Sequence, residues 1–150
     1  MAQSLSSILV HLIFSTKERY PFIKPPVADE LHAYLAPVCA TCGCPARRVG
    51  GTDDHIHILF SLARTMAVSD LVEEVKKSSS KWVKTKGPEL RPFAWQNGYG
   101  AFSIGQPRAA AVVRYIANQA EHHKTRTFQD EFRLFLQRYE VQYDERYVWD

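Results

Sequence analysis

Between Asp53 and Phe60 the sequence reads DDHIHILF, with two histidines separated by one isoleucine in a run that continues apolar. This run predicts a β-strand, and residues two apart in a strand point to the same face. His55 and His57 therefore share one face, while Ile56 and Phe60 share the other and can anchor the strand in a core. Two imidazoles side by side on a rigid strand are a natural pair of metal ligands. Two exposed polar residues on a half-solvated strand are the alternative that this pattern alone leaves open.

Apolar residues at strand or helix spacing divide the rest of the chain into alternating elements. Residues 7–15 (SILVHLIFS) are nearly all apolar, which predicts a central strand covered on at least one face. Pro26 can open a helix, because the amides of the first turn make no hydrogen bonds within the helix. Ser69 can cap another helix, because its hydroxyl can accept a hydrogen bond from one of these amides. The full order is a strand at 7–15, a helix at about 26–41, a weak strand at 46–51, the histidine strand, a helix from 69 to about 86, a short strand at 101–104, and helices at about 106–125 and 127–139.

This order, β-α-β-β-α-β followed by two helices, is the split β-α-β arrangement of ferredoxin-like folds. We therefore predict an α+β fold in which an antiparallel sheet carries its first two helices on one face, with C-terminal helices in addition. A chain of 150 residues can bury a core without disulfides, so residues 1–150 are expected to form a single domain.

Three clustered cysteines, Cys39, Cys42 and Cys44, argue against a secreted disulfide framework. A structural zinc site needs about four ligands, and a redox pair needs a helix N-terminus, whereas these cysteines lie at a predicted helix C-terminus. Reduced thiols without a function of their own are favoured over both. No apolar run approaches the roughly 20 residues of a membrane span, and no secretion signal is evident, so we expect a cytoplasmic protein.

The net charge of +3 is too small to establish a polyanionic partner, but the basic residues are clustered. Local clusters of this kind suit a phosphate backbone, although solvated helix faces look much the same. The candidate DNA contacts are Lys17, Arg19, Lys77, Lys81 and Lys84.

The segment from 88 to 105 is rich in proline, glycine and aromatic residues and predicts a long loop that ends in a short strand. Its aromatic residues could stack on nucleic-acid bases. Aromatic residues in loops more often close over the edge of a core, and we favour that interpretation. The residues concerned are Phe93, Trp95, Tyr99 and Phe102.

Tyr115, Gln119 and His122 share one stripe of the predicted third helix, because they are spaced four and three residues apart. A phenol becomes a usable nucleophile once it is deprotonated, and a glutamine carbonyl is an acceptable ligand for Mg²⁺ or Mn²⁺. If this stripe met His55 and His57, the site would combine a metal with a tyrosine hydroxyl. An ordinary helix shoulder is the alternative, since Tyr and His are often only partly buried.

Several motifs in order resemble the single-tyrosine HUH transposases of small bacterial insertion sequences, where HUH denotes histidine, hydrophobic residue, histidine. The motifs are HLIFSTK at 11–17, DDHIHILF at 53–60, KKSSSKW at 76–82, WQNGYGAFSIG at 95–105 and VVRYIANQAEHH at 112–123. Each motif is weak alone. Together they follow the order and spacing of the family and cover most of the chain.

The resemblance implies that His55, His57 and Gln119 hold a divalent metal, Mg²⁺ or Mn²⁺, and that Tyr115 is the nucleophile. It implies an endonuclease and strand transferase that recognises hairpins in single-stranded DNA and forms a 5′-phosphotyrosine intermediate. It also implies a homodimer in which the tyrosine helix can complete the active site of the other subunit, so that Tyr115 and the histidines need not meet within one chain. His122 is a possible assisting residue, and either it or His123 could serve as an additional ligand or proton acceptor.

Asp53 and Asp54 could orient the imidazoles, although a turn before the strand is the favoured role. Two other His-x-His enzyme classes are excluded at position 59, which is Leu59. Histidine-triad hydrolases would need a histidine there, and metallo-β-lactamase-type sites an aspartate. A non-catalytic or domesticated ferredoxin-like nucleic-acid-binding module is the main alternative function, and it has no need of Tyr115 together with three metal ligands.

Overall fold

The central strands β1 (Leu9–Ser15) and β3 (His55–Ser61) are almost entirely buried, because helices cover both faces of the sheet to which they belong. In the computed structural model, which describes all 150 residues, these strands pair with β2 (Ala46–Gly51) and β4 (Gly100–Ile104). The order is β2-β3-β1-β4, and every neighbouring pair is antiparallel. The predicted ferredoxin-like sheet is therefore confirmed.

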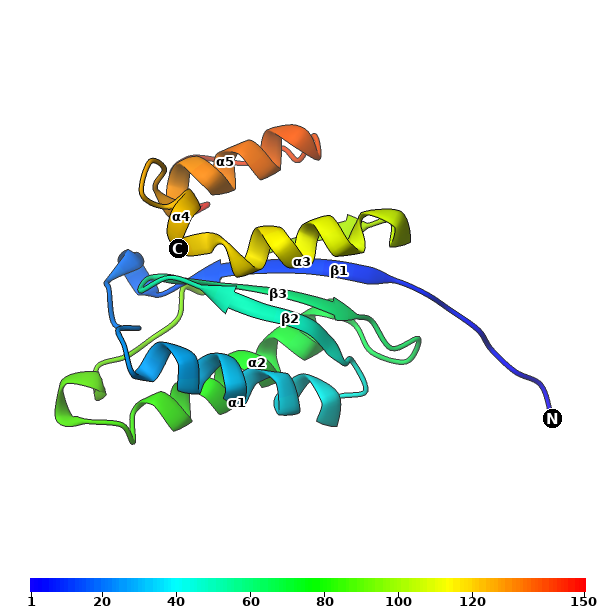
Figure 1. The fold of residues 1–150 in the computed structure, drawn as a ribbon, viewed down its shortest axis with the longest axis horizontal. Helices are drawn as coiled ribbons and strands as arrows, with labels where there is room; N and C mark the ends of the chain where they lie inside the picture. The colour runs from blue at the N-terminus through cyan, green and yellow to red at the C-terminus, as the bar shows by residue number, and fades with distance from the viewer.

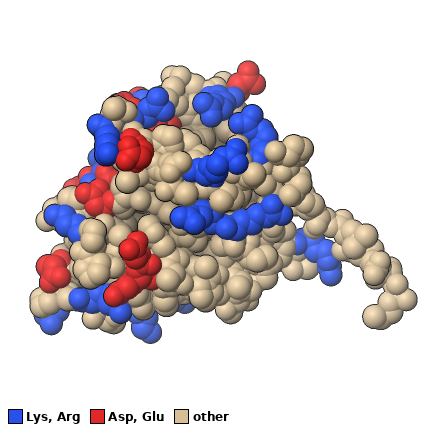
Figure 2. Space-filling model, in the orientation of Figure 1, with Lys and Arg blue, Asp and Glu red and all other residues tan.

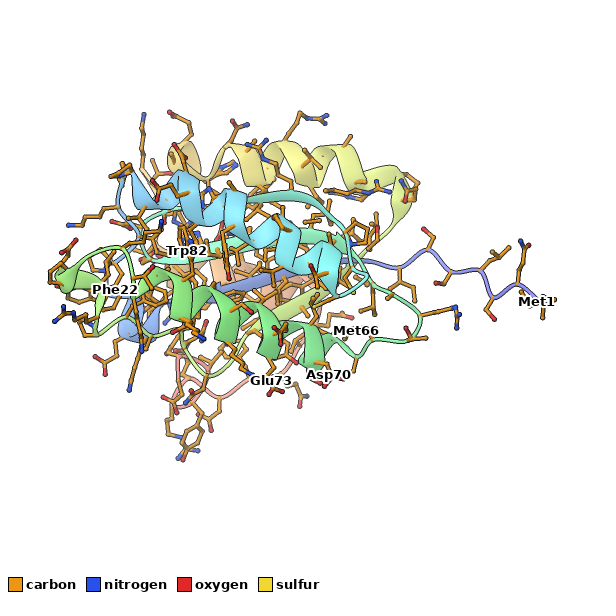
Figure 3. All side chains as sticks on the ribbon, turned by 90° about the horizontal axis from the view of Figure 1, so that it is seen from below. Met1, Phe22, Met66, Asp70, Glu73 and Trp82 are labelled. Atoms are coloured by element: carbon orange, nitrogen blue, oxygen red, sulfur yellow. The ribbon has the colours of Figure 1, made fainter.

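Helices α1 (Val27–Thr41) and α2 (Val68–Val83) lie side by side on one face of the sheet (Figures 1 and 3). They cover the larger apolar core, to which the strands contribute alternate residues such as Leu12, Ile56 and Phe60. Figure 3 shows Trp82 directed from α2 toward α1, where its ring stacks on Tyr34 at 4.9 Å. The predicted placement of the first two helices on one face is confirmed.

The opposite face carries α3 (Ala109–Ala117), α4 (Gln119–His122) and α5 (Phe128–Arg138), as Figure 1 shows. Helix α3 packs through Ala109 and Ile116 against Leu9 and Leu59. Helix α5 buries four apolar side chains against Ile13 and the β4 strand. They are Phe128, Phe132, Phe135 and Leu136. The short 3-10 turns η1 (Lys17–Arg19), η2 (Pro88–Leu90) and η3 (Gln106–Arg108) lie in the connections.

Two boundary predictions were wrong. The predicted third helix is interrupted at Asn118, whose backbone leaves the helical region, so α3 and α4 are separate. The second helix begins at Val68 with Ala67 as its cap residue, and Ser69 does not cap it. In the long loop, Phe93 and two of its three aromatic companions are buried, which confirms the favoured core role for those residues.

The chain after α5 packs back against the domain. Trp149 lies against Phe128 and Phe132, and the Asp150 carbonyl accepts a hydrogen bond from the Gly98 amide at 2.9 Å. Cys39 and Cys44 are buried and all three cysteines are free thiols. None of the helices combines the length and the apolar character that a bilayer crossing requires.

Candidate active site

His55 and His57 project from the face of β3 that α3, α4 and α5 cover, and both are fully buried. The neighbouring Ile56 enters the core on the opposite face. The shared direction that the His-x-His spacing predicts is thus found in the structure. The alternative of two exposed polar residues on a solvated strand is wrong, because the C-terminal helices close over this face.

The His55 imidazole lies between two side-chain oxygen atoms. Its Nδ1 is 2.7 Å from Asp54 Oδ1, and its Nε2 is 2.8 Å from Gln119 Oε1. An ionised carboxylate can only accept a hydrogen bond, so His55 Nδ1 donates and Nε2 of the neutral ring keeps a lone pair. Asp54 therefore orients this imidazole. The backbone carbonyl of Asp54 also accepts a hydrogen bond from the Thr16 amide, in the turn before the strand.

The His57 imidazole is held on both sides by other side chains. Its Nδ1 lies 2.8 Å from His11 Nε2, and its Nε2 lies 3.0 Å from Glu131 Oε1. Burial lowers the pKa of His57 to about 4, although the carboxylate of Glu131 acts in the opposite direction. The ring is therefore neutral at pH 7, as a metal ligand must be.

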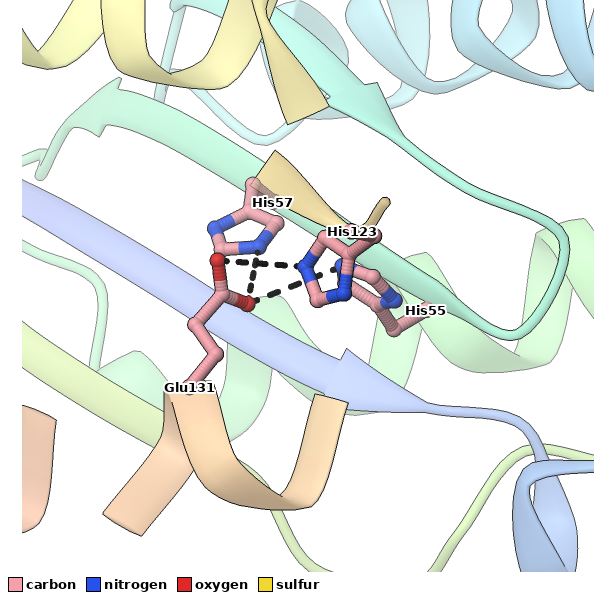
Figure 4. A group of neighbouring side chains, drawn as sticks. All are labelled: His55, His57, His123 and Glu131. Atoms are coloured by element: carbon pink, nitrogen blue, oxygen red, sulfur yellow. Dashed lines mark hydrogen bonds and ion pairs between the residues drawn. The ribbon is translucent and has the colours of Figure 1, made fainter. Parts of the chain in front are cut away.

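Glu131, on α5, lies at the centre of the cluster and was not predicted from the sequence (Figure 4). Its side chain is 1% exposed, accepts hydrogen bonds from the Tyr115 hydroxyl and from Gln119 Nε2, and lies 3.3 Å from His123 Nε2. Burial alone would raise the pKa of Glu131, but its histidine contacts hold that pKa well below the ordinary value. A signal was available, because Glu131 is a charged residue on the stripe formed by Phe128 and Phe135.

Tyr115 is half-buried at the end of α3, with its hydroxyl directed at Glu131. Burial and the negative charge of Glu131 raise the pKa of Tyr115 well above its ordinary value. Gln119 follows after the break at Asn118, and its amide contacts both His55 and Glu131. The structure thus brings Tyr115, Gln119 and the two histidines together within one chain.

His122, the last residue of α4, and His123, which follows it, have different surroundings. His122 stacks on the Tyr115 ring at 4.5 Å and lies outside the metal-ligand cluster, so its assisting role stays a prediction. His123 enters the cluster instead, where its buried Nε2 lies 3.3 Å from Glu131 Oε2 but not in hydrogen-bond geometry. Burial alone would lower the pKa of His123, but the contact with Glu131 raises it above the ordinary value.

The cluster fits a divalent cation. The ligand atoms of His55, His57, His123 and Glu131 lie within 4.8 Å of one another. In addition, the lone pair of His55 Nε2 faces Gln119 Oε1, so two acceptors converge at 2.8 Å without a hydrogen between them when the ring is neutral. A cation at this point satisfies both. Imidazole nitrogens with amide and carboxylate oxygens suit Mn²⁺ and, with more oxygen ligands, Mg²⁺.

A cavity of about 560 Å³ adjoins Tyr115 between α3 and α5. His11 and Phe135 contribute to its wall, and the exposed Arg108 and Arg138 stand at its border. Figure 2 shows Lys and Arg gathered over the middle of the face that α3 and β2 present, while most visible Asp and Glu lie toward its left side.

The predicted DNA contacts fall in two places, neither of them in the cluster. Lys17 and Arg19 lie in η1, in a cavity beside Trp149. The other three, Lys77, Lys81 and Lys84, belong to α2 and its end, on the opposite face of the sheet from Tyr115. Their contact with DNA stays a prediction.

Comparison with known proteins gives one family and several relatives. Residues 4–119 match the family described as "Transposase IS200 like". The ISDra2 transposase TnpA of Deinococcus radiodurans is 26% identical over 114 residues, which cover 73% of this chain and 81% of that protein.

Two solved structures share the fold. A candidate transposase from Deinococcus radiodurans R1 superimposes with a TM-score of 0.62 at 23% identity, over 79% of this chain and 98% of that one. A REP-associated tyrosine transposase bound to a REP hairpin gives a TM-score of 0.59 at 15% identity, over 82% of this chain and 74% of that one.

Proposed function

The chain belongs to the IS200-like transposase family, and we propose that it cleaves and rejoins single-stranded DNA with Tyr115 as the nucleophile. The observation that carries this proposal is the position of the Tyr115 hydroxyl in a buried cluster with two imidazoles and an amide. A phenol, which can form a covalent phosphodiester, thereby lies beside groups that can bind a cation.

In the proposed reaction the phenolic oxygen of Tyr115 attacks the scissile phosphorus. The new bond is a 5′-phosphotyrosine, the phenol loses its proton, and the bond from phosphorus to the 3′-oxygen breaks, so that this oxygen takes up a proton and leaves as a free 3′-hydroxyl. Attack by another 3′-hydroxyl on the adduct restores the tyrosine and joins the strands, so the step needs no ATP. His55, His57 and Gln119 would hold a divalent metal, Mg²⁺ or Mn²⁺, which offsets charge on the phosphoryl oxygens when it is bound.

We propose hairpins in single-stranded DNA as the substrate. The similar solved structure is bound to a REP hairpin, which supports this substrate class. The cavity beside Tyr115 is bordered by Arg108 and Arg138, and guanidinium groups are suited to phosphate oxygens. These features favour a path for the cleaved strand between α3 and α5.

A homodimer is also part of the proposal, on the strength of the resemblance. The arrangement of Tyr115 beside His57 in one chain supports catalysis within each subunit, because no residue of the cluster has to come from a partner. Exchange of the tyrosine helix between subunits is the alternative arrangement.

The decisive experiment incubates the protein and Mn²⁺ or Mg²⁺ with labelled hairpin DNA taken from the genomic flanks of the gene. We expect a protein–DNA adduct that resists denaturant in the wild type and no adduct for Tyr115→Phe. Tyr147→Phe, at a tyrosine that is 63% exposed, is the matched control and should form the adduct normally. Hairpin binding by the wild type without any adduct would instead support the non-catalytic binding module.

A further inference from the structure

Glu131 is a buried carboxylate with no lysine or arginine partner. It is 1% exposed, and its polar neighbours are three imidazoles, the Gln119 amide and the Tyr115 hydroxyl. A carboxylate is almost never fully buried unless it is paired with a cation or coordinates a metal. The possible cationic partners of Glu131 in the chain are therefore imidazoles alone, of which His123 lies 3.3 Å from Oε2.

We propose that Glu131 is a ligand of the divalent ion, so that the C-terminal helix α5 completes the metal site formed by His55, His57 and Gln119. The inference rests on the proposed function, because it assigns a further ligand to the same site. It adds an anionic oxygen to a set that otherwise consists of neutral groups.

The distances among the ligand atoms agree with this assignment. Ligands about 2.1 Å from an octahedral ion lie about 3 Å apart when they are adjacent. Glu131 Oε1 is 3.0 Å from His57 Nε2 and 3.7 Å from His55 Nε2. His55 Nε2 is in turn 2.8 Å from Gln119 Oε1. One carboxylate oxygen thus stands at the spacing of an adjacent ligand from His57, while its 3.7 Å distance from His55 is longer than that spacing.

The second carboxylate oxygen has a separate partner. Glu131 Oε2 accepts hydrogen bonds from the Tyr115 hydroxyl and, at 3.2 Å, from Gln119 Nε2. The Gln119 bond fixes its amide so that Oε1 faces His55. With Oε1 on the ion, Glu131 connects the metal site to the nucleophile through a single side chain.

The family match ends at residue 119, so neither α5 nor Glu131 lies within the matched region. The three ligands proposed from the resemblance lie inside it. The additional ligand thus belongs to a segment beyond the matched region, and this segment packs on the sheet through Phe128 and Phe132.

The test measures metal binding by the full-length protein without DNA, so its readout does not depend on cleavage. Mn²⁺ is titrated by calorimetry and by electron paramagnetic resonance into the wild type, Glu131→Gln and Glu131→Ala. Glu131→Gln preserves the volume and can still accept the Tyr115 hydrogen bond, which protects the fold. Glu121→Gln is the matched control, because Glu121 pairs with Lys124 at the surface. Circular dichroism checks that each variant is folded.

We expect Mn²⁺ affinity to fall about tenfold or more in Glu131→Gln, and further in Glu131→Ala, because affinity depends on the number of charged ligands. Glu121→Gln should bind like the wild type. Unchanged or tighter binding in folded Glu131→Gln would overturn the inference, and tighter binding would identify Glu131 as a group that competes with the ion.

His55→Ala separates this inference from the proposed function. If His55→Ala loses Mn²⁺ binding while Glu131→Gln keeps it, the metal site stands and only the role of Glu131 is wrong. If the wild type binds no Mn²⁺ and forms no DNA adduct, the proposed function itself fails.

Discussion

The carboxylate of Asp54 determines which nitrogen of His55 is free to bind a cation. Because Asp54 Oδ1 accepts the Nδ1 hydrogen at 2.7 Å, the lone pair is fixed on Nε2, the atom that faces Gln119. Such partners of metal-binding histidines hold the ring orientation and raise its basicity. A residue that also forms part of the turn before β3 thus sets the chemistry of its neighbour.

We expect Asp54→Asn to weaken Mn²⁺ binding by about 10- to 100-fold, because the amide no longer holds the His55 hydrogen with a full charge. Asp53→Asn is the matched control, since the exposed Asp53 precedes it without contacting the ring. Calorimetric titration of both variants checks the prediction. Equal affinities for the two variants would show that Asp54 serves only the turn.

The buried histidines predict loss of stability in weak acid. Burial lowers the pKa of His57 from 6.5 to about 4. Between pH 6.5 and pH 4 this histidine is therefore protonated in the unfolded chain and neutral in the folded protein. Stability from this group is present above pH 6.5 and is lost as the pH falls toward 4, on the order of 3 kcal/mol. His11, whose pKa burial also lowers, acts in the same direction, whereas the raised pKa of His123 acts against it.

Urea unfolding of the metal-free protein in EDTA should therefore show a midpoint that falls between pH 7 and pH 5. His57→Gln removes the titrating group and should flatten this dependence. His122→Gln, at a histidine outside the hydrogen-bonded cluster, should retain the wild-type slope. A midpoint that stays level in the wild type contradicts the assignment of a buried neutral His57.

Local spacing placed His55 and His57 on one face of a strand and Tyr115 and Gln119 on one stripe of a helix, and the family resemblance then joined the four residues in one site. Glu131 was missed because its burial depends on how α5 docks onto the sheet, which no local period specifies. The charged position within an apolar stripe was a signal, but surface and buried glutamates look alike until the helix has a partner.

At the level of elements, Gly50 allows α3 to lie close to the sheet. Gly50 pairs with His57 across β2 and β3, and a Cβ at this position would lie 2.7 Å from the carbonyl oxygen of Ile116. That carbonyl belongs to the residue after Tyr115. The missing side chain therefore sets the distance between the nucleophile and the histidine strand.

We expect Gly50→Ala to lower the free energy of unfolding by about 1–3 kcal/mol, because the added methyl group forces the tightly packed backbone of α3 to shift. It should also lower adduct formation by moving Tyr115 away from Glu131. Gly105→Ala is the control, since its Cβ would meet Pro107 at an ordinary 3.8 Å. Urea unfolding and adduct yield are the measurements. If both variants behave alike, close packing at Gly50 does not position Tyr115.

The break at Asn118 explains why His123 lies in the cluster, whereas His122 on the predicted stripe lies outside it. In a continuous helix, His122 shares the stripe of Tyr115 and Gln119. Asn118 has φ −101° and ψ 23°, so the chain turns before α4, and His123 reaches the cluster while His122 stacks on Tyr115. A sequence without glycine or proline at this point gives no sign of the interruption, which accompanies the contacts of Gln119 and His123 with Glu131 of α5.

For the whole molecule, the completeness of the cluster in one chain predicts how mixed subunits behave. We expect a co-expressed mixture of Tyr115→Phe and His55→Ala to form no DNA adduct, because each subunit lacks one part of its own site. Mixtures of wild type with either variant serve as controls for expression and folding. Adduct recovered in the double mixture would show that subunits exchange the tyrosine helix.

The two faces of the sheet carry different basic residues, and only one of these faces adjoins the nucleophile. Arg108 and Arg138 border the cavity beside Tyr115, whereas Lys77, Lys81 and Lys84 lie on or at the end of α2 across the sheet. Each phosphate contact with a single strand adds about 0.7 to the slope of log affinity against log salt. If the DNA strand passes Tyr115, the salt dependence of its binding should therefore depend on the two arginines and not on the three lysines.

We expect the double variant Arg108→Ala, Arg138→Ala to bind a labelled single strand more weakly, with a salt slope smaller by about 1.4, since two contacts are removed. The triple variant of the α2 lysines to alanine is the matched control, because it removes more charge from the other face. Fluorescence anisotropy between low and moderate salt measures both slopes. If the lysine variant lost the larger part of the slope, the DNA path would lie over α2, and Tyr115 could reach the strand only by leaving the cluster that now surrounds it.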